Sequence, residues 1–196
     1  PSKGGVIESL KAKAERGKEF VDNRNERGFN ELRGYFIDEG GFLSSMDQPA
    51  EVSVLEQGPL FVKVAVKGKI GKYSFTQTIR LTQGEPRIDM SVKLDWIGSP
   101  RIGEPGIEFR ADNPRKSFYD DRYKLLVYLP IQIANQQIYK DAPLDVCESR
   151  LENTFFNRWD SIKHNIILNW VDVASKDNSC GLSLLSLIHI SEPTRL

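Results

Sequence analysis

Residues 52–96 alternate apolar and polar positions with the two-residue period of strands that bury one face. Three runs carry the pattern, and the positions on their apolar faces are Val62, Val64 and Val66, then Tyr73, Phe75, Gln77, Ile79 and Leu81, then Ile88, Met90, Val92, Leu94 and Trp96. The connections at 67–72 and 82–87 hold turn-forming residues and are too short for crossover helices. The pattern predicts an antiparallel meander whose apolar face needs a second layer, as in a β-sandwich.

The remaining segments also favour an all-β chain. We expect strands at residues 51–56, 107–110, 123–129, 136–141 and 165–173, a loop at 39–49, an irregular connection at 97–113 and a long charged loop at 144–163. Residues 8–16 are good helix formers, yet the glycines on both sides suit a hairpin. The residues alone leave helix and hairpin open there.

Charge and composition exclude some classes of partner. A chain of 196 residues fits one domain, and its 27 Lys and Arg balance its 27 Asp and Glu. We therefore expect no nucleic-acid partner, which requires a basic surface, and no membrane partner, because no apolar run reaches about 18 residues. The sequence contains no HExxH, CxxC, P-loop or GxGxxG pattern, so the common metal and phosphate signatures are missing.

The last residues have an unusual pattern. Residues 185–195 read LSLIHISEPTR, which resembles a translated sequencing adaptor. We therefore expect one domain over 1–184 and an adaptor-derived tail over 185–196, in which His189 has no chemical role. The alternative is a terminal strand at 184–190. Together with a first residue that is Pro1 rather than Met, the tail favours a fragment of a longer reading frame.

A series of short motifs gives the chain a family resemblance. The motifs are GGVIESL at 4–10, GKEFVD at 17–22, FNEL at 29–32, EQGPL at 56–60, QTIRL at 77–81, LDW at 94–96, YKDAPLD at 139–145 and NWVD at 169–172. Over residues 4–184 their order resembles the C-terminal β-domain of glycoside hydrolase family 38. The resemblance implies an antiparallel β-sandwich of the galactose-mutarotase-like supersandwich type, present here as an incomplete copy. It also favours a hairpin over residues 7–21.

The resemblance implies a function for the parent protein. Family members are zinc-dependent retaining α-mannosidases, which hydrolyse terminal α-mannosides. Their nucleophile, acid/base carboxylate and zinc ligands lie in an N-terminal catalytic domain and the helical bundle after it. We therefore expect no catalytic residue, cofactor or metal in this chain, zinc in the parent enzyme, and two partners: the N-terminal catalytic domain and α-mannoside glycans. Asp95, Asp120, Asp121, Asp141 and Asp145 are better explained as solvated surface acids than as a catalytic pair.

Two stretches could contribute to the rim of the parent's active site. In relatives a tyrosine near the stretch 29–35 approaches the sugar, which makes Tyr35 and Asn30 candidates, with packing as the alternative role for Tyr35. The second group lies in the charged loop and comprises Arg150, Arg158, Trp159 and Asp160. Arginine offers a planar fork of donors and tryptophan a stacking face, whereas a salt-bridge network between domains is the alternative role.

Two other functions share the expected fold. A free-standing carbohydrate-binding β-sandwich would expose a row of aromatic side chains on one sheet face, but Tyr73, Phe75 and Trp96 are expected in the core. An aldose mutarotase would use histidine together with a carboxylate, and outside the tail only His164 is available. The supporting domain of an α-mannosidase is therefore the leading interpretation.

Overall fold

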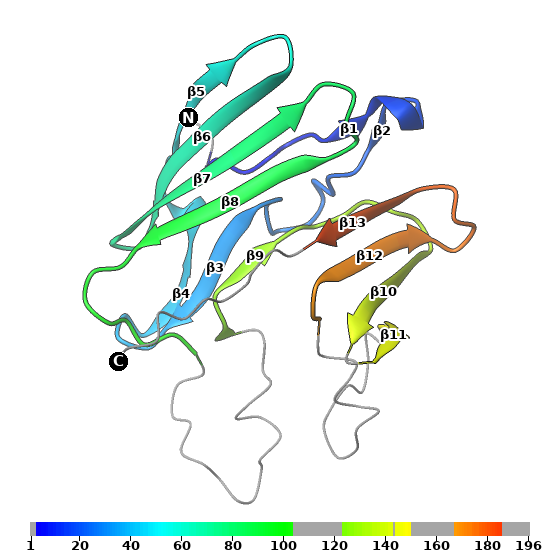
Figure 1. The fold of residues 1–196 in the computed structure, drawn as a ribbon. Coiled ribbons are helices and arrows are strands. Elements are labelled where there is room, and N and C mark those ends of the chain that lie inside the picture. The colour runs from blue at the N-terminus through cyan, green and yellow to red at the C-terminus, as the bar shows by residue number, and fades with distance from the viewer. Residues whose placement is uncertain (1–2, 104–122, 143, 150–166, 186–196) are drawn as a thin grey trace, which may run out of the picture. The chain divides into compact units, whose positions relative to one another are not determined.

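A computed structural model describes residues 3–103, 123–142, 144–149 and 167–185. The chain falls into two compact units, Pro1–Gln132 and Ile133–Leu196. The described secondary structure consists of antiparallel strands and two short 3-10 helices (Figure 1), which confirms the predicted all-β sandwich class.

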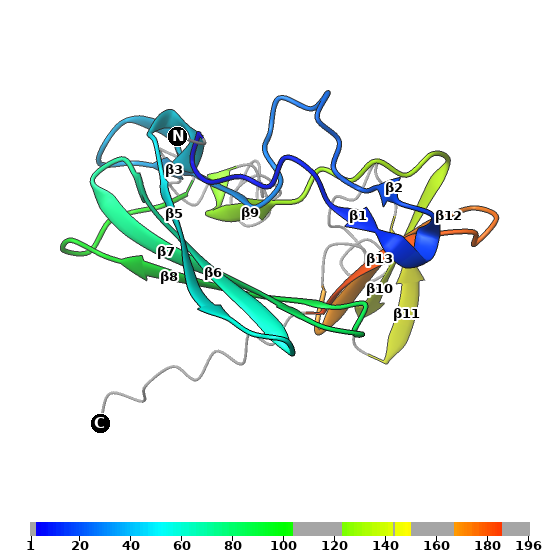
Figure 2. The same ribbon diagram turned by 90° about the horizontal axis from the view of Figure 1, so that it is seen from above.

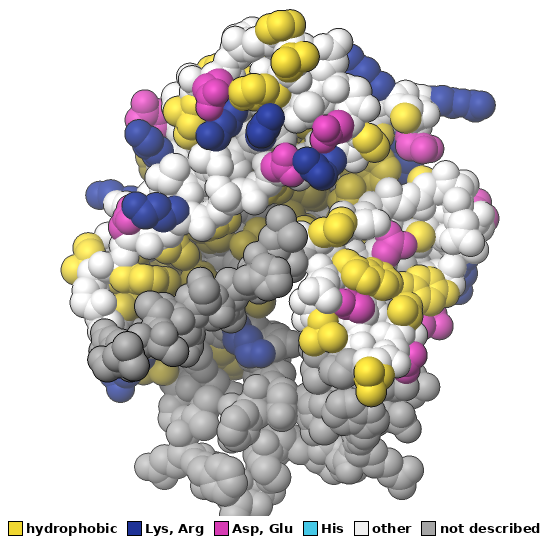
Figure 3. Space-filling view, in the orientation of Figure 1, with side chains coloured by type: hydrophobic (Ala, Val, Ile, Leu, Met, Phe, Trp, Pro, Cys, Tyr) yellow, Lys and Arg dark blue, Asp and Glu magenta, His cyan; other side chains and the backbone are white. Residues whose placement is uncertain are grey.

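The largest sheet of the first unit is the predicted meander. Its four strands follow the order β5-β6-β7-β8, with bounds β5 Glu51–Gln57, β6 Phe61–Ile70, β7 Tyr73–Thr82 and β8 Ile88–Asp95. The register places Val64 opposite Ile79 and Ile79 opposite Met90, so the apolar positions of neighbouring strands share one face. Charged side chains of both signs are scattered among hydrophobic and uncharged ones over this sheet in the space-filling view (Figure 3).

A three-stranded sheet forms the second layer of the first unit. Its order is β4-β3-β9, with bounds β3 Glu31–Phe36, β4 Gly41–Ser44 and β9 Leu126–Tyr128. The two sheets appear as separate layers in Figure 2 and meet in one apolar core. The buried members of the core are Leu32, Phe36, Ala50, Val66, Ile70, Tyr73 and Phe75. A period of two in β3 thus directs Leu32 and Phe36 inward.

The apolar face of the four-stranded sheet is covered only at one end. Near the β6–β7 turn, Ile70, Tyr73 and Phe75 are at most 1% exposed. Farther along the same strands, Leu81 is 51% exposed, and Val54 on β5 is 59% exposed. Within the part of the chain that the structure describes, the second layer therefore covers the end of the meander near the β6–β7 turn and leaves the other end exposed.

The N-terminal segment of the first unit is a hairpin. Strand β1 Lys11–Ala12 pairs with β2 Lys18–Glu19, and the 3-10 helix η1 Lys13–Glu15 lies between them. Gly17 closes the turn with a φ of 77°, a backbone angle that glycine adopts without strain. The hairpin that the family resemblance favoured over residues 7–21 is confirmed.

The described part of the second unit forms a four-stranded antiparallel sheet. Its order is β11-β10-β12-β13, with bounds β10 Gln136–Ala142, β11 Asp145–Glu148, β12 Trp170–Ser175 and β13 Gly181–Leu185. Asp141 fixes the approach to β12, because its carboxylate accepts the backbone N–H groups of Leu168, Asn169 and Trp170 at 2.8–3.1 Å.

Three expectations about these elements were wrong. The expected loop at 39–49 contains β4 and the 3-10 helix η2 Ser45–Asp47, because a tight turn at Gly40, with a φ of 70°, returns the chain onto β3. The expected loop at 144–163 contains β11. Trp96 follows the end of β8 and is 44% exposed, although its ring still meets that of Tyr73 edge-on at 5.4 Å.

Other boundaries differ less. The strand expected at 165–173 begins at Trp170, and Ile167 and Leu168 before it are about half exposed. Strand β13 was not expected, although the alternative terminal strand at 184–190 shares Leu184 and Leu185 with it. The strand expected at 107–110 and the remainder of the tail lie outside the described residues.

Candidate functional site

The candidate site lies on the face of the β4-β3-β9 sheet that points away from the core. Because side chains alternate along a strand, β3 directs Glu31, Arg33 and Tyr35 to this face. The register places Phe42 opposite Tyr35 and Ser44 opposite Arg33. On the other side, Tyr128 of β9 lies opposite Glu31. We call this the polar face of β3.

Three aromatic rings gather at one end of the polar face. The rings of Tyr35 and Phe42 meet edge-on with centroids 5.1 Å apart, and those of Tyr35 and Tyr123 do so at 5.3 Å. Phe42 and Tyr123 are stacked at 5.4 Å, with 25° between their planes. Such distances are those of favourable aromatic pairs. Tyr35, predicted as a rim residue, thus belongs to a half-buried aromatic cluster.

Gly34 explains how Tyr123 reaches this cluster. A Cβ atom on Gly34 would lie 3.1 Å from the Leu125 Cα and 3.3 Å from the Lys124 carbonyl oxygen. These distances are tighter than ordinary contacts, so a side chain at position 34 would push the segment before β9 away. The missing side chain lets residues 123–125 run close to β3 and brings Tyr123 beside Tyr35.

A pocket of about 350 Å³ opens beside the aromatic cluster. Its lining residues are Glu26, Arg27, Arg33, Phe42, Tyr123 and Tyr128. Aromatic walls with a few charged groups are typical of sites for small polar ligands. The guanidinium of Arg33 lies over the Phe42 ring, 3.8 Å from its centroid, which holds the charge at the pocket wall.

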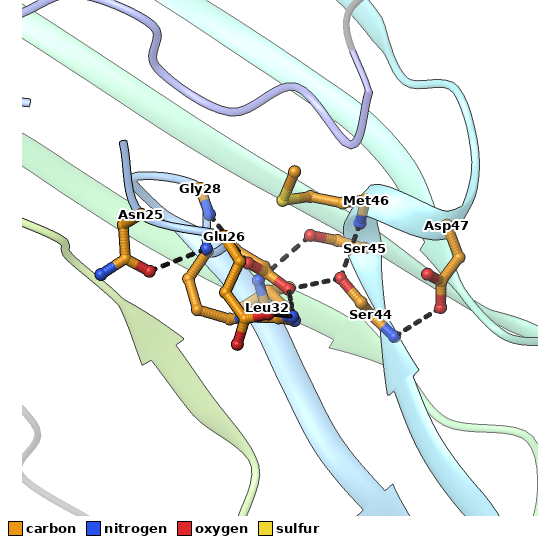
Figure 4. Close-up of polar contacts among 10 residues, drawn as sticks. Asn25, Glu26, Gly28, Leu32, Ser44, Ser45, Met46 and Asp47 are labelled. Atoms are coloured by element: carbon orange, nitrogen blue, oxygen red, sulfur yellow. Dashed lines mark hydrogen bonds and ion pairs between the residues drawn. The ribbon is translucent and has the colours of Figure 1, made fainter. Parts of the chain in front are cut away.

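A buried carboxylate, that of Glu31, holds one of the arginines that line the pocket. Glu31 has no exposed surface, and its oxygens accept bonds from the Gly28 N–H at 2.8 Å and the Ser44 hydroxyl at 2.6 Å (Figure 4). Arg27 donates to the same carboxylate at 3.1 Å, while its other terminal nitrogen lies 3.5 Å from Glu26. The buried charge is therefore paired and hydrogen-bonded, and it fixes Arg27 at the pocket wall.

A capping box fixes the end of β4 beside this carboxylate. The Ser44 hydroxyl accepts the N–H of Met46 at 3.0 Å, and the Asp47 carboxylate accepts the N–H of Ser44 at 2.9 Å. The neighbouring Ser45 hydroxyl accepts the N–H of Leu32 at 3.1 Å (Figure 4). These bonds orient Ser44 so that its own hydroxyl can donate to Glu31.

Asn30, the second residue predicted for the rim, is fully buried. Its side-chain oxygen accepts the N–H of Ile7 at 2.8 Å, and its amide nitrogen donates to the Gln77 side chain. The Gln77 amide returns a bond to the Asn30 carbonyl at 3.0 Å. A φ of 66° is one that asparagine tolerates better than most residues. In this structure Asn30 joins the two sheets and does not line the pocket.

The other predicted rim residues cannot be placed. Arg150, Arg158, Trp159 and Asp160 lie outside the described residues, as do Asp120 and Asp121. Among the acids that were weighed as a catalytic pair, Asp95 forms an exposed ion pair with Lys93 at 3.1 Å. Burial raises the pKa of Asp141, but hydrogen bonds from Trp170, Asn169 and Leu168 outweigh it and lower the pKa overall, so this group stays ionised.

The described residues contain neither a cluster of metal ligands nor a helix that could span a membrane. Residues 3–103, 123–142, 144–149 and 167–185 bring no three His, Cys, Asp or Glu side chains close enough to hold a metal ion. The same part of the chain contains no helix with the length and apolar character needed to cross a bilayer.

None of the six residues that line the pocket was predicted from the sequence, and the predicted Tyr35 packs beside the pocket. Arg33 and Phe42 would have followed from two-residue alternation if β4 had been recognised, because Phe42 is the cross-strand partner of Tyr35. Arg27 and Tyr123 had no local signal. Their positions depend on the buried Glu31 and on the close passage at Gly34, which are tertiary features.

Comparison with known families gives one match. A family model described as the glycosyl hydrolases family 38 C-terminal domain matches residues 34–188. The match includes Tyr35, Phe42, Tyr123 and Tyr128, whereas the resemblance noted at 4–33 lies outside it. Comparisons with curated proteins and with solved structures gave no match.

Proposed function

The chain belongs to the family of C-terminal domains of family 38 glycosyl hydrolases, and on this premise we propose that it is the active-site-supporting β-domain of an α-mannosidase. The parent enzyme would hydrolyse terminal α-mannosides with retention of configuration. This chain would contribute part of the surface that faces the glycan and would not catalyse hydrolysis alone.

The pocket on the polar face of β3 carries this proposal. Sugars present flat C–H faces that pack on aromatic rings and hydroxyl groups that need donors and acceptors. Phe42 and Tyr123 supply rings at the pocket, with Tyr35 packed edge-on against both, while Arg27 and Arg33 supply fixed donors at the wall. The three-stranded sheet holds them on a rigid frame, which suits a surface that orients a glycan.

Catalysis is proposed to reside in an N-terminal domain. A retaining glycosidase needs two carboxyl groups about 5–5.5 Å apart, one as nucleophile and one as acid/base. At the pocket, the Glu31 carboxylate is fully buried and engaged by Arg27, Gly28 and Ser44, so it is built to position Arg27 rather than to attack a sugar. Zinc in the parent is proposed to be held by that other domain.

An activity assay tests the proposal. We expect no hydrolysis of 4-nitrophenyl α-D-mannopyranoside by the purified chain. The coding sequence upstream of the Pro1 codon should encode a catalytic domain, and the two parts expressed together should hydrolyse the substrate. In that combined enzyme Tyr35→Ala should raise KM more than it lowers kcat. Turnover by the chain alone, or an upstream sequence without a catalytic domain, would contradict the proposal.

A free-standing carbohydrate-binding β-sandwich is the second candidate. The grouping of Tyr35, Phe42 and Tyr123 on one sheet face favours it, because binding modules present aromatic rings in this way. Titration of the chain with mannose separates the two candidates: millimolar or tighter binding favours a module, whereas weaker binding favours a supporting domain that acts only beside its catalytic partner.

A further inference from the structure

Arg33 is a half-buried cation whose side-chain donors have no acceptor among the residues that the structure describes. Its one described interaction is the contact with the Phe42 ring, 3.8 Å from the guanidinium to the ring centroid. No carboxylate of the described residues lies within ion-pair distance of it. The guanidinium N–H donors of Arg33 are therefore available to an acceptor on a ligand at the pocket wall.

The other charges of the pocket are already engaged. Arg27 is held between the buried Glu31 at 3.1 Å and the exposed Glu26 at 3.5 Å. The pocket lining and the Glu31 carboxylate together hold two arginines and two glutamates, so their formal charge is zero. Within the described part of the chain, Arg33 is the one of these four that has no counter-ion. A ligand would therefore be recognised through the geometry of Arg33 rather than through a broad positive field.

Guanidinium chemistry defines the class of ligand. Arginine presents about five N–H donors in a rigid plane that matches a carboxylate in a bidentate pair. Stacking on Phe42 fixes this plane before the ligand arrives and lowers the entropic cost of binding. A singly charged carboxylate is favoured over a doubly charged phosphate, because Glu26 also lines the pocket and repels additional negative charge.

We propose that the pocket binds an acidic hexose, with the C6 carboxylate of a uronate on the Arg33 fork and the sugar ring beside Tyr123 and Tyr128. The inference rests on the proposed function in one respect, namely that the ligand is a sugar. It adds that the pocket prefers a charged sugar to a neutral one, and it assigns this preference to Arg33.

Calorimetric titration of the whole chain tests the preference with a matched pair of ligands. Methyl α-D-mannopyranosiduronate and methyl α-D-mannopyranoside differ only at C6, where the first has a carboxylate and the second a hydroxymethyl group. We expect the uronate to bind about tenfold more tightly, the effect of one charge-assisted pair. Arg33→Gln should remove the preference, so that uronate and mannoside bind with similar affinities. Arg33→Lys should keep a smaller preference, because it retains the charge without the fork.

A matched control and an ion control complete the test. Arg80 also lies over an aromatic ring, that of Phe61 at 4.3 Å, but it is exposed and does not line the pocket, so Arg80→Gln should leave both affinities unchanged. Sodium acetate should bind far more weakly than the uronate.

Each other outcome overturns the inference in a distinguishable way. Equal affinities for uronate and mannoside would refute it and leave the proposed supporting role intact. If acetate bound as tightly as the uronate, the pocket would be a site for a carboxylate ion and not for an acidic sugar. No binding of either sugar would also refute it, while the proposed function would still be judged by the separate hydrolysis assay.

Discussion

The two faces of β3 differ in composition and in role. On one face Leu32 and Phe36 are at most 1% exposed and pack against Ile70, Tyr73 and Phe75 of the other sheet. On the polar face Arg33 and Tyr35 are half-buried beside a pocket, on the same strand as the paired carboxylate of Glu31. One short strand thus contributes to stability on one side and to a candidate ligand site on the other.

The difference between the two faces of β3 explains how the side chains of the polar face are kept in position. The core face fixes the backbone of β3, and two-residue alternation then places the polar-face side chains without any loop rearrangement. Sites built on regular elements hold their side chains more exactly than sites built on loops. Substitutions on the two faces should therefore separate stability from ligand binding.

The largest effect is expected on the core face. Phe36→Ala should lower the free energy of unfolding by about 3–5 kcal/mol, because it leaves a cavity beside Tyr73, whose ring stacks on that of Phe36 at 5.3 Å. Urea unfolding measures the change. The matched control is Phe42→Ala on the polar face, which is 37% exposed and should cost less than about 1.5 kcal/mol. Equal losses for the two variants would contradict the division between the faces.

The next largest effect concerns the buried carboxylate of Glu31. Glu31→Ala should cost about 2–3 kcal/mol, since it leaves the Ser44 hydroxyl and the Gly28 N–H without their acceptor and leaves Arg27 without its buried partner. It should also weaken ligand binding, because Arg27 is then free to move. Glu31→Gln keeps the shape and should recover part of the stability. A neutral effect of Glu31→Ala in urea unfolding would show that this network does not support β3.

A smaller effect is expected at the close approach of β3 and residues 123–125. Gly34→Ala should cost about 1–2 kcal/mol, because the new Cβ would meet the Leu125 Cα at 3.1 Å. It should also shift the NMR signals of the Tyr123 ring, since the segment must move away from Tyr35. Gly41→Ala is the control, because nothing lies within 4 Å of a Cβ atom there. Unchanged Tyr123 signals in Gly34→Ala would contradict the proposed packing.

The smallest effect tests a region that belongs to neither face. In the β1–β2 hairpin, hydrogen bonds from the Ser9 hydroxyl and the N–H groups of Leu10 and Val21 lower the pKa of Glu19 from 4.5 to about 2. A carboxyl group with a lowered folded-state pKa stabilises the fold above its unfolded-state pKa, and this contribution is lost as pH falls through the folded-state value. Acid should therefore weaken the hairpin between about pH 4.5 and pH 2, a window given by that shift.

Carboxyl-carbon NMR of Glu19 across this window measures the effect. Ser9→Ala removes the largest single cause of the shift, so the pKa of Glu19 should rise toward 4.5 in that variant. An unchanged pKa would show that the Ser9 hydroxyl does not hold the carboxylate. Ligand binding on the polar face of β3 should stay the same in Ser9→Ala, because the hairpin contributes no side chain to the pocket lining.

Periodic patterns predicted the parts of this fold that local sequence determines. The meander β5–β8 followed from alternation over 52–96, because its turns are short and its apolar face is continuous. Strand β4 was missed because Gly41 to Ser44 is too short to show a clear alternation of apolar and polar residues, and its sequence resembles a turn. Its pairing with β3 identifies it as a strand. Trp96 was misplaced because alternation was extended one residue beyond the end of β8.

The site was less predictable than the fold for a physical reason. Tyr35 was named through a family resemblance and stays a prediction as a rim residue. Arg27, Arg33, Phe42 and Tyr123 acquire their positions from pairings between segments far apart in the chain. Glu31 offered no local sign that it would be buried, since its burial depends on Arg27 and on the Ser44 capping box. Sequence patterns report strand periodicity but not the partner across the sheet.

NMR of the aromatic side chains during titration with methyl α-D-mannopyranoside tests the central claim most directly. If the polar face of β3 receives the sugar, the ring signals of Tyr35, Phe42 and Tyr123 should shift with ligand concentration, while those of Phe36 and Tyr73 on the core side remain in place. Unchanged Tyr35 and Tyr123 signals, or equal shifts at Phe36 and Tyr73, would contradict it.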